Sequence, residues 1–101
     1  MNNIMSAVHE EVVISIQTHM MRVGSDANLW YVGLANNIKK KLFEDNKVSE
    51  HNGKWIYRIL ESNAEAMEIK KHLVSVGMKS NDNDDTDGNT VFAYQKPNLE
   101  K

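Results

Sequence analysis

A strand that leads almost directly into a capped helix is the feature that most limits how this chain can fold. Residues 54–60 (KWIYRIL) are mostly apolar and aromatic, which predicts a strand. Ser62 and Glu65 then have the spacing of a capping box, in which each side chain accepts a hydrogen bond from a backbone N–H of the first turn. The helix that follows should end at Gly77. Its predicted apolar stripe consists of Ala66, Ile69, Leu73 and Val76. Strands and helices in such close succession predict a sheet with helices packed on it.

Two more helices and two more strands are predicted along the chain. Apolar residues spaced three and four apart predict a helix over residues 8–23, although the β-branched residues within it would also suit a strand. Residues 29–34 (LWYVGL) predict a buried strand, and a short helix with an asparagine cap should follow through about Asp45. Residues 90–95 predict the last strand. The predicted fold class is α+β: a single compact domain over residues 1–101, with a small three-stranded sheet covered by three helices.

The composition excludes several classes of protein. A chain of 101 residues suits one domain, and 41% apolar with 26% charged residues argues against intrinsic disorder. The sequence contains no cysteine, which excludes disulfides, thiolate zinc sites and cysteine nucleophiles. No apolar run approaches the roughly 20 residues that span a bilayer, and the first residues lack the pattern of a secretory signal. We therefore expect a cytoplasmic protein that does not enter a membrane.

Residues 80–89 form an acidic segment that we expect to be an exposed loop, and residues 96–101 should be a flexible tail. Residues 83–88 (NDDTDG) resemble the first half of an EF-hand calcium loop, but Tyr94 stands where the bidentate glutamate of such a loop belongs. A solvated loop is therefore favoured over a calcium site, and no metal ligand is assigned. The aspartates of the loop could instead bind a basic partner by mimicking the charge of a nucleic acid. These candidate binding residues are Asp82, Asp84, Asp85 and Asp87.

Basic residues suggest a second candidate binding surface. Twelve basic against fourteen acidic residues give a net charge of −2, so a surface that binds polyanions throughout is not expected. A local patch is compatible with this balance, because basic residues beside strand aromatics can bind single-stranded nucleic acid. The residues of this patch would be Lys39, Lys40, Lys41 and Arg58. Aromatic residues in a small sheet are more often part of the core, and core packing is the favoured interpretation of them.

Two segments resemble a known family. Residues 31–42 (YVGLANNIKKKL) resemble the second strand and first helix of GIY-YIG nuclease domains, and residues 65–74 (EAMEIKKHLV) resemble the second catalytic helix of the same family. The resemblance implies that a motif tyrosine stands at Tyr31, that the arginine position falls on Lys41, and that the metal-binding glutamate position falls on Lys70. In an active member this glutamate would hold a divalent metal such as Mg²⁺, which stabilises the charge that develops on phosphorus.

The two lysines at these positions imply that the hydrolytic site is inactive. Lys41 keeps the charge of an arginine but loses the planar fork that binds phosphate through two hydrogen bonds. The ammonium of Lys70 cannot ligate a metal ion and repels it. No catalytic residue and no cofactor are therefore assigned to the chain.

Three functions are compatible with these residues. The leading prediction is a non-catalytic binding or regulatory module on a GIY-YIG-like scaffold, which masks a partner protein. Its size and charge would suit an inhibitor of a nucleic-acid-handling enzyme, of the kind that phages and other mobile elements carry. The alternatives are a metal-dependent GIY-YIG-type endonuclease with its acid and arginine at other positions, and a nucleic-acid-binding protein that uses the lysine-rich helix.

Overall fold

Four strands form one mixed sheet in the computed structural model of this protein. The structure describes residues 7–22, 27–45, 48, 54–81 and 84–95. The expected tail over residues 96–101 and the last residue of the first predicted helix, Val23, lie outside the described residues. The strands are β1 (Trp30–Ala35), β2 (Trp55–Ile59), β3 (Lys79–Ser80) and β4 (Thr90–Gln95). Their order is β2-β4-β1-β3, with β4 antiparallel to β1 and β2 and with β3 parallel to β1, so β2 and β3 are the outer strands.

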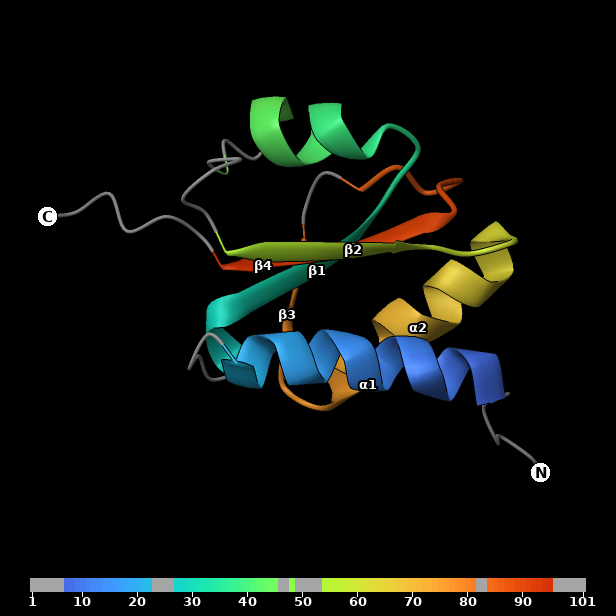
Figure 1. The fold of residues 1–101 in the computed structure, drawn as a ribbon. Coiled ribbons are helices and arrows are strands. Elements are labelled where there is room, and N and C mark those ends of the chain that lie inside the picture. The colour runs from blue at the N-terminus through green and yellow to red at the C-terminus, as the bar shows by residue number, and fades with distance from the viewer. Residues whose placement is uncertain (1–6, 23–26, 46–47, 49–53, 82–83, 96–101) are drawn as a thin grey trace, which may run out of the picture.

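Helical elements cover both faces of this sheet (Figure 1). α1 (Ala7–Arg22) and α2 (Asn63–Ser75) lie on one face. η2 (Lys40–Asp45), which winds as a π-helix, lies on the other face, and a short 3₁₀ turn, η1 (Ala27–Leu29), leads into β1. The predicted α+β class is therefore confirmed, as a compact domain in which three helices cover a small sheet.

The larger core lies between the sheet and the two α-helices. Trp30 and Val32 alternate along β1 towards this face and are fully buried. The helices meet them with Val13, Ile16 and Met20 from α1 and with Ala66, Ile69 and Leu73 from α2. The predicted stripe of α2 is thus confirmed at three of its positions.

The sequence signals at both ends of α2 are also confirmed. Ser62 Oγ accepts a hydrogen bond from the Glu65 N–H at 3.2 Å, and the Glu65 carboxylate accepts one from the Glu61 N–H at 3.1 Å. At the other end Gly77 has a φ of 121°, a left-handed conformation that favours glycine.

A smaller core lies on the η2 face. Phe92 and Tyr94 of β4 are buried there beside Leu42 of η2. The Tyr31 ring stacks on Tyr94 with 5.6 Å between centroids, and Trp55 packs at the edge of the same cluster. Most strand aromatics therefore belong to a core, as expected.

Several details differ from the sequence expectations. The sheet has four strands instead of the predicted three. The additional strand, β3, was not predicted because it pairs only with Tyr31 and Val32 and is too short to show an alternation of apolar and polar residues. The short helix after β1 was expected as an ordinary α-helix but winds as a π-helix from Lys40. Val76 is 43% exposed as the C-cap residue of α2 and does not extend its stripe. Residues 12–16, most of which are β-branched, belong to α1, so the strand alternative is wrong there.

Buried and exposed positions of α2 should differ in their contribution to stability. Ile69→Ala should lower the free energy of unfolding by about 2–5 kcal/mol, because Ile69 is completely buried against the sheet. Met67→Ala, at a position 51% exposed on the same helix, should change it by less than about 1 kcal/mol. Urea unfolding followed by circular dichroism measures both values. Equal effects of the two substitutions would contradict this packing of α2.

Candidate functional site

The segment that follows β3 closes the edge of β1 and brings two aspartates to the candidate site. Its backbone continues the pairing of β3, because the Asn81 N–H donates to Val32 O at 2.9 Å and the Asp85 N–H donates to Leu34 O at 3.0 Å. Gly33 lies between these two acceptors, and a Cβ atom there would stand 2.3 Å from a carboxylate oxygen of this segment. The close approach of the segment to β1 therefore requires glycine at this position.

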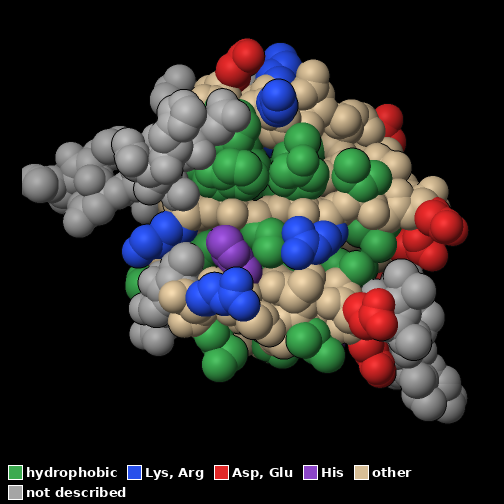
Figure 2. All heavy atoms as spheres, in the orientation of Figure 1, with side chains coloured by type: hydrophobic (Ala, Val, Ile, Leu, Met, Phe, Trp, Pro, Cys, Tyr) green, Lys and Arg blue, Asp and Glu red, His purple; other side chains and the backbone are tan. Residues whose placement is uncertain are grey.

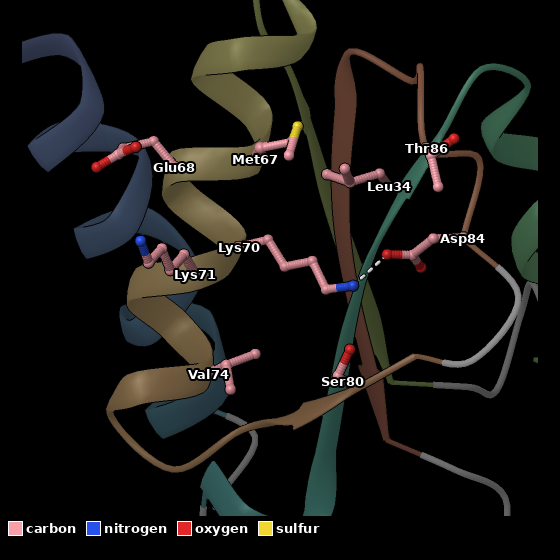
Figure 3. A pocket seen from close by; sticks show the side chains of 9 residues that line it. All are labelled: Leu34, Met67, Glu68, Lys70, Lys71, Val74, Ser80, Asp84 and Thr86. Carbon is pink, nitrogen blue, oxygen red and sulfur yellow. Dashed lines mark hydrogen bonds and ion pairs between the residues drawn. The ribbon is translucent and has the colours of Figure 1, made fainter.

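Lys70 reaches this segment from α2 (Figure 3). Its ammonium forms an ion pair with the Asp84 carboxylate, and the two side chains are only 19% and 10% exposed. The other Asp84 oxygen accepts a hydrogen bond from the Asn81 amide at 3.3 Å, and Asn81 Oδ1 accepts one from the Tyr94 hydroxyl at 2.7 Å. The position implied for a metal-binding glutamate therefore holds a cation that is neutralised within the chain.

Lys41 reaches the same segment from η2. Its ammonium lies 3.1 Å from Asp85 Oδ1, and only 9% of its side chain is exposed. Asp85 Oδ2 accepts a hydrogen bond from the Asn36 N–H at 2.9 Å, and Asp87 accepts one from the Asn36 side chain at 2.8 Å. The Asn36 N–H and the nearby Lys41 ammonium lower the pKa of Asp85 below its usual 3.8. The implied arginine position thus also holds a paired cation.

The expectation that residues 80–89 form an exposed acidic loop is confirmed at Thr86 and Asp87, which are exposed and belong to no helix or strand, but it is wrong for Asp84 and Asp85. The side chain of Asp84 is 10% exposed and that of Asp85 is 32% exposed, because the segment seals the edge of β1 and two lysines supply its countercharges. Asp87 is exposed, whereas Asp82 lies outside the described residues. The oxygens of Asp85 and Asp87 that an EF-hand would offer to calcium accept contacts from within the chain instead.

Tyr31 and the helix that carries Lys70 lie on opposite faces of the sheet. The Tyr31 ring stacks on Tyr94 on the η2 face, with the Lys79 ammonium 5.8 Å from its centroid, while α2 covers the other face (Figure 1). In the part of the chain that the structure describes, α1 instead of a strand precedes β1, and no strand there carries the first motif of the GIY-YIG family. The sheet therefore separates Tyr31, the implied tyrosine position, from the helix that carries Lys70, the implied position of the metal-binding glutamate.

A groove of about 480 Å³ lies between α2 and the segment after β3 (Figure 3). Leu34, Met67 and Val74 supply apolar lining, and the ion pair of Lys70 with Asp84 spans the groove. Among the described residues, His, Asp and Glu side chains do not form a group of three that could hold a metal ion. The groove thus offers apolar surface next to a neutralised ion pair.

The basic residues expected to form one surface are separated by the sheet. Lys39 and Lys40 are exposed on the η2 side, whereas Lys41 is buried. Arg58 follows Ile56 at a spacing of two along β2, and Ile56 packs into the core under the α-helices. Arg58 therefore faces the side opposite to the lysine-rich helix.

The outer strand β2 carries two strand aromatics, Trp55 and Tyr57, for which core packing was the favoured interpretation, and an exposed Ile59 that the sequence analysis did not single out. Trp55, Tyr57 and Ile59, which we call the β2 row, alternate on the η2 face, and Figure 2 shows hydrophobic side chains in a row along this strand. Tyr57 is 36% and Ile59 is 68% exposed, and the Tyr57 ring stacks on Trp55 with 6.2 Å between centroids. The sequence does indicate this row, because Trp55, Tyr57 and Ile59 occupy every second position of the strand, where a face exposed to solvent would carry polar residues.

Comparison with known proteins reveals no relative: no family model, no curated protein and no solved structure matches this chain. None of the described helices combines the length and the apolar character needed to pass through a lipid bilayer. The assignment of a function therefore depends on the residues and their geometry.

The contacts of Asp85 predict a stability that depends on pH. Because the pKa of Asp85 is lowered in the folded chain, its carboxylate stabilises the fold above pH 3.8, and this contribution is lost as the pH falls through the lower folded-state value. Asp85→Asn should therefore lower the unfolding temperature near pH 7, and the difference from the wild type should shrink below pH 3.8.

Thermal unfolding followed by circular dichroism between about pH 7 and pH 2 measures this difference. Asp87→Asn is the matched control, because Asp87 is exposed and its carboxylate has no lysine partner among the described residues. A difference between Asp85→Asn and the wild type that stays constant over the whole pH range would refute the assignment.

Proposed function

We propose that this protein is a non-catalytic binding module that masks a partner protein. The observation that carries the proposal is the β2 row, whose side chains form an apolar strip along an outer strand. Ile59 alone leaves 68% of its surface in water, although burial of such a side chain is worth about 1.5–3 kcal/mol. Exposed apolar strips are typical of surfaces that bind other proteins.

The paired lysines support the non-catalytic part of the proposal. Metal-assisted hydrolysis of a phosphodiester needs a carboxylate that holds the ion and a cation that can reach the phosphate. Lys70 replaces the carboxylate that the resemblance implies, and Asp84 and Asp85 already neutralise Lys70 and Lys41. Neither lysine can bind a phosphate without losing its aspartate partner inside the chain. This favours a protein that binds a partner over an enzyme that hydrolyses a phosphodiester.

The biological role that we propose is regulation of another protein in the cytoplasm. On this proposal the segments that resemble GIY-YIG domains lack the metal ligand of that family, and the chain serves as a platform for binding. An inhibitor of a nucleic-acid-handling enzyme, carried by a phage or another mobile element, fits a chain of 101 residues with a net charge of −2.

Loss of the β2 row should weaken partner binding. Tyr57→Lys combined with Ile59→Lys should reduce, by roughly tenfold, the capture of the proteins that the wild-type chain retains from an extract of its own cells. Affinity capture with quantitative mass spectrometry measures this ratio. The matched control is Met21→Lys combined with Val76→Lys, which changes two exposed apolar residues on other elements. Partners retained equally by both double variants would refute the proposal.

Nuclease activity, the first alternative, is directly measurable. The purified chain with plasmid DNA and Mg²⁺ or Mn²⁺ should give no cleavage that EDTA suppresses, because the Lys70 ammonium repels a metal ion at the implied position. Cleavage that EDTA suppresses and that Tyr31→Phe abolishes would instead support the endonuclease.

Nucleic-acid binding, the second alternative, is tested on the same preparation. Lys39→Glu combined with Lys40→Glu should not change the affinity for a single-stranded oligonucleotide at moderate salt. If this variant weakens the binding and flattens its dependence on salt, the lysine-rich helix is the functional surface.

A further inference from the structure

One edge of the sheet is open along β2. The Lys54 carbonyl accepts a hydrogen bond from β4 at 3.0 Å, and the Leu60 N–H donates one to the residue before β4 at 2.8 Å. Because backbone groups alternate in direction along a strand, Tyr57 and Ile59 point their N–H and C=O groups away from β4. In the part of the chain that the structure describes, no strand pairs with them on that side. Figure 2 shows the backbone of β2 across the front of the molecule, below the row of hydrophobic side chains.

The guanidinium of Arg58 lies over this edge. Arg58 Nη1 donates a hydrogen bond to Tyr57 O at 2.7 Å, so a charged side chain occupies the place of a neighbouring strand. None of the described carboxylates lies within ion-pair distance of Arg58, and Lys54 on the same side of β2 is exposed. The open edge is therefore flanked by apolar side chains on the η2 face and by cations on the α1 face.

The geometry points to the addition of a fifth, antiparallel strand at β2, contributed by an extended segment of a partner protein whose residues alternate between apolar and acidic. This inference rests on the proposed function and names the chemistry of the partner. The apolar residues of the segment would lie over Tyr57 and Ile59, and a carboxylate on its other side would pair with Arg58. An N–H of the segment would then replace the guanidinium at Tyr57 O.

The charges of the edge argue for this partner over a second copy of the chain. Two copies joined through β2, with Tyr57 opposite Tyr57, would place Arg58 opposite Ile56 of the second copy. The diagonal neighbours of Arg58 would then be the second copy's Lys54 and Arg58, so four cations would gather on one side of the joined sheet. A partner segment with acidic residues supplies the charge that a second copy lacks.

A short synthetic peptide tests the inference on the full chain. The probe is the acetylated and amidated heptapeptide Val-Glu-Val-Thr-Val-Glu-Val, added to ¹⁵N-labelled protein. In an antiparallel pair the valines, opposite Tyr57 and Ile59, direct their N–H groups to β2. The probe should therefore shift the amide resonances of Tyr57 and Ile59 and slow the hydrogen exchange of both amides.

Two modified peptides separate strand pairing from simple apolar contact. N-methylation of the valines should abolish binding, whereas N-methylation of the glutamates should leave it intact, because only the valine N–H groups face β2. The peptide with lysine in place of glutamate should bind roughly tenfold more weakly. Arg58→Glu should reverse this preference, and its unchanged resonances on α2 would show that the variant still folds.

The inference is overturned if none of the peptides binds, if both N-methylated peptides bind equally, or if the shifts fall on Met67 and Val74 in the groove beside α2. It is also overturned if the chain alone forms a dimer that Tyr57→Lys dissociates, because a second copy then fills the edge. If partner capture depends on Tyr57 and Ile59 while the peptides fail, the binding module stands and only strand addition is refuted.

Discussion

Two ion pairs, of Lys70 with Asp84 and of Lys41 with Asp85, are the interactions on which the rest of the structure depends. The segment that carries the aspartates runs along the side of β1 that β3 leaves open, and its backbone pairs with alternate residues of that strand. Without the lysines, two neighbouring carboxylates would meet at one edge of the sheet with no countercharge. With them, α2 on one face and η2 on the other are both joined to the same edge, so one short segment links the two helical layers.

The same pairs limit the chemistry of the site. A mostly buried ion pair that loses one partner leaves a charge with little solvation, which costs up to about 3–5 kcal/mol where burial is complete and less at partly exposed positions. A phosphate or a metal ion would have to compensate for this loss. The hydrogen bonds from Tyr94 to Asn81 and from Asn81 to Asp84 further hold the acceptor in place. This favours a structural role for side chains that would act on phosphate in a nuclease, and it leaves the outer surface as the part of the molecule that can bind a partner.

Signals that act within one element could be predicted from the sequence. The Ser62 cap and the stripe of α2 depend only on neighbours one turn away, so the cap and three of the four stripe positions were predicted correctly. The burial of Asp84 could not be predicted locally, because its countercharge, Lys70, lies fourteen residues earlier on a different element. The same limit applies to the β2 row. Whether Ile59 is buried or exposed depends on which strand lies in the middle of the sheet, and this follows from the antiparallel insertion of β4 between β1 and β2.

The two sides of the sheet differ in how firmly their edges are closed. At the β1 edge, the segment that follows β3 in the chain pairs with the strand through backbone hydrogen bonds, and ion pairs hold its aspartates. At the β2 edge, the Arg58 guanidinium covers the backbone at Tyr57 O. A side chain can rotate away at the cost of one hydrogen bond to a charged group, about 1.5–3 kcal/mol, whereas release of the segment would break two backbone hydrogen bonds and two ion pairs. An unprotected edge would pair with any extended chain. Because Arg58 covers this edge, a strand that carries a negative charge can pair there more favourably than one that does not. The side chain that blocks unspecific pairing therefore also determines which strands can bind.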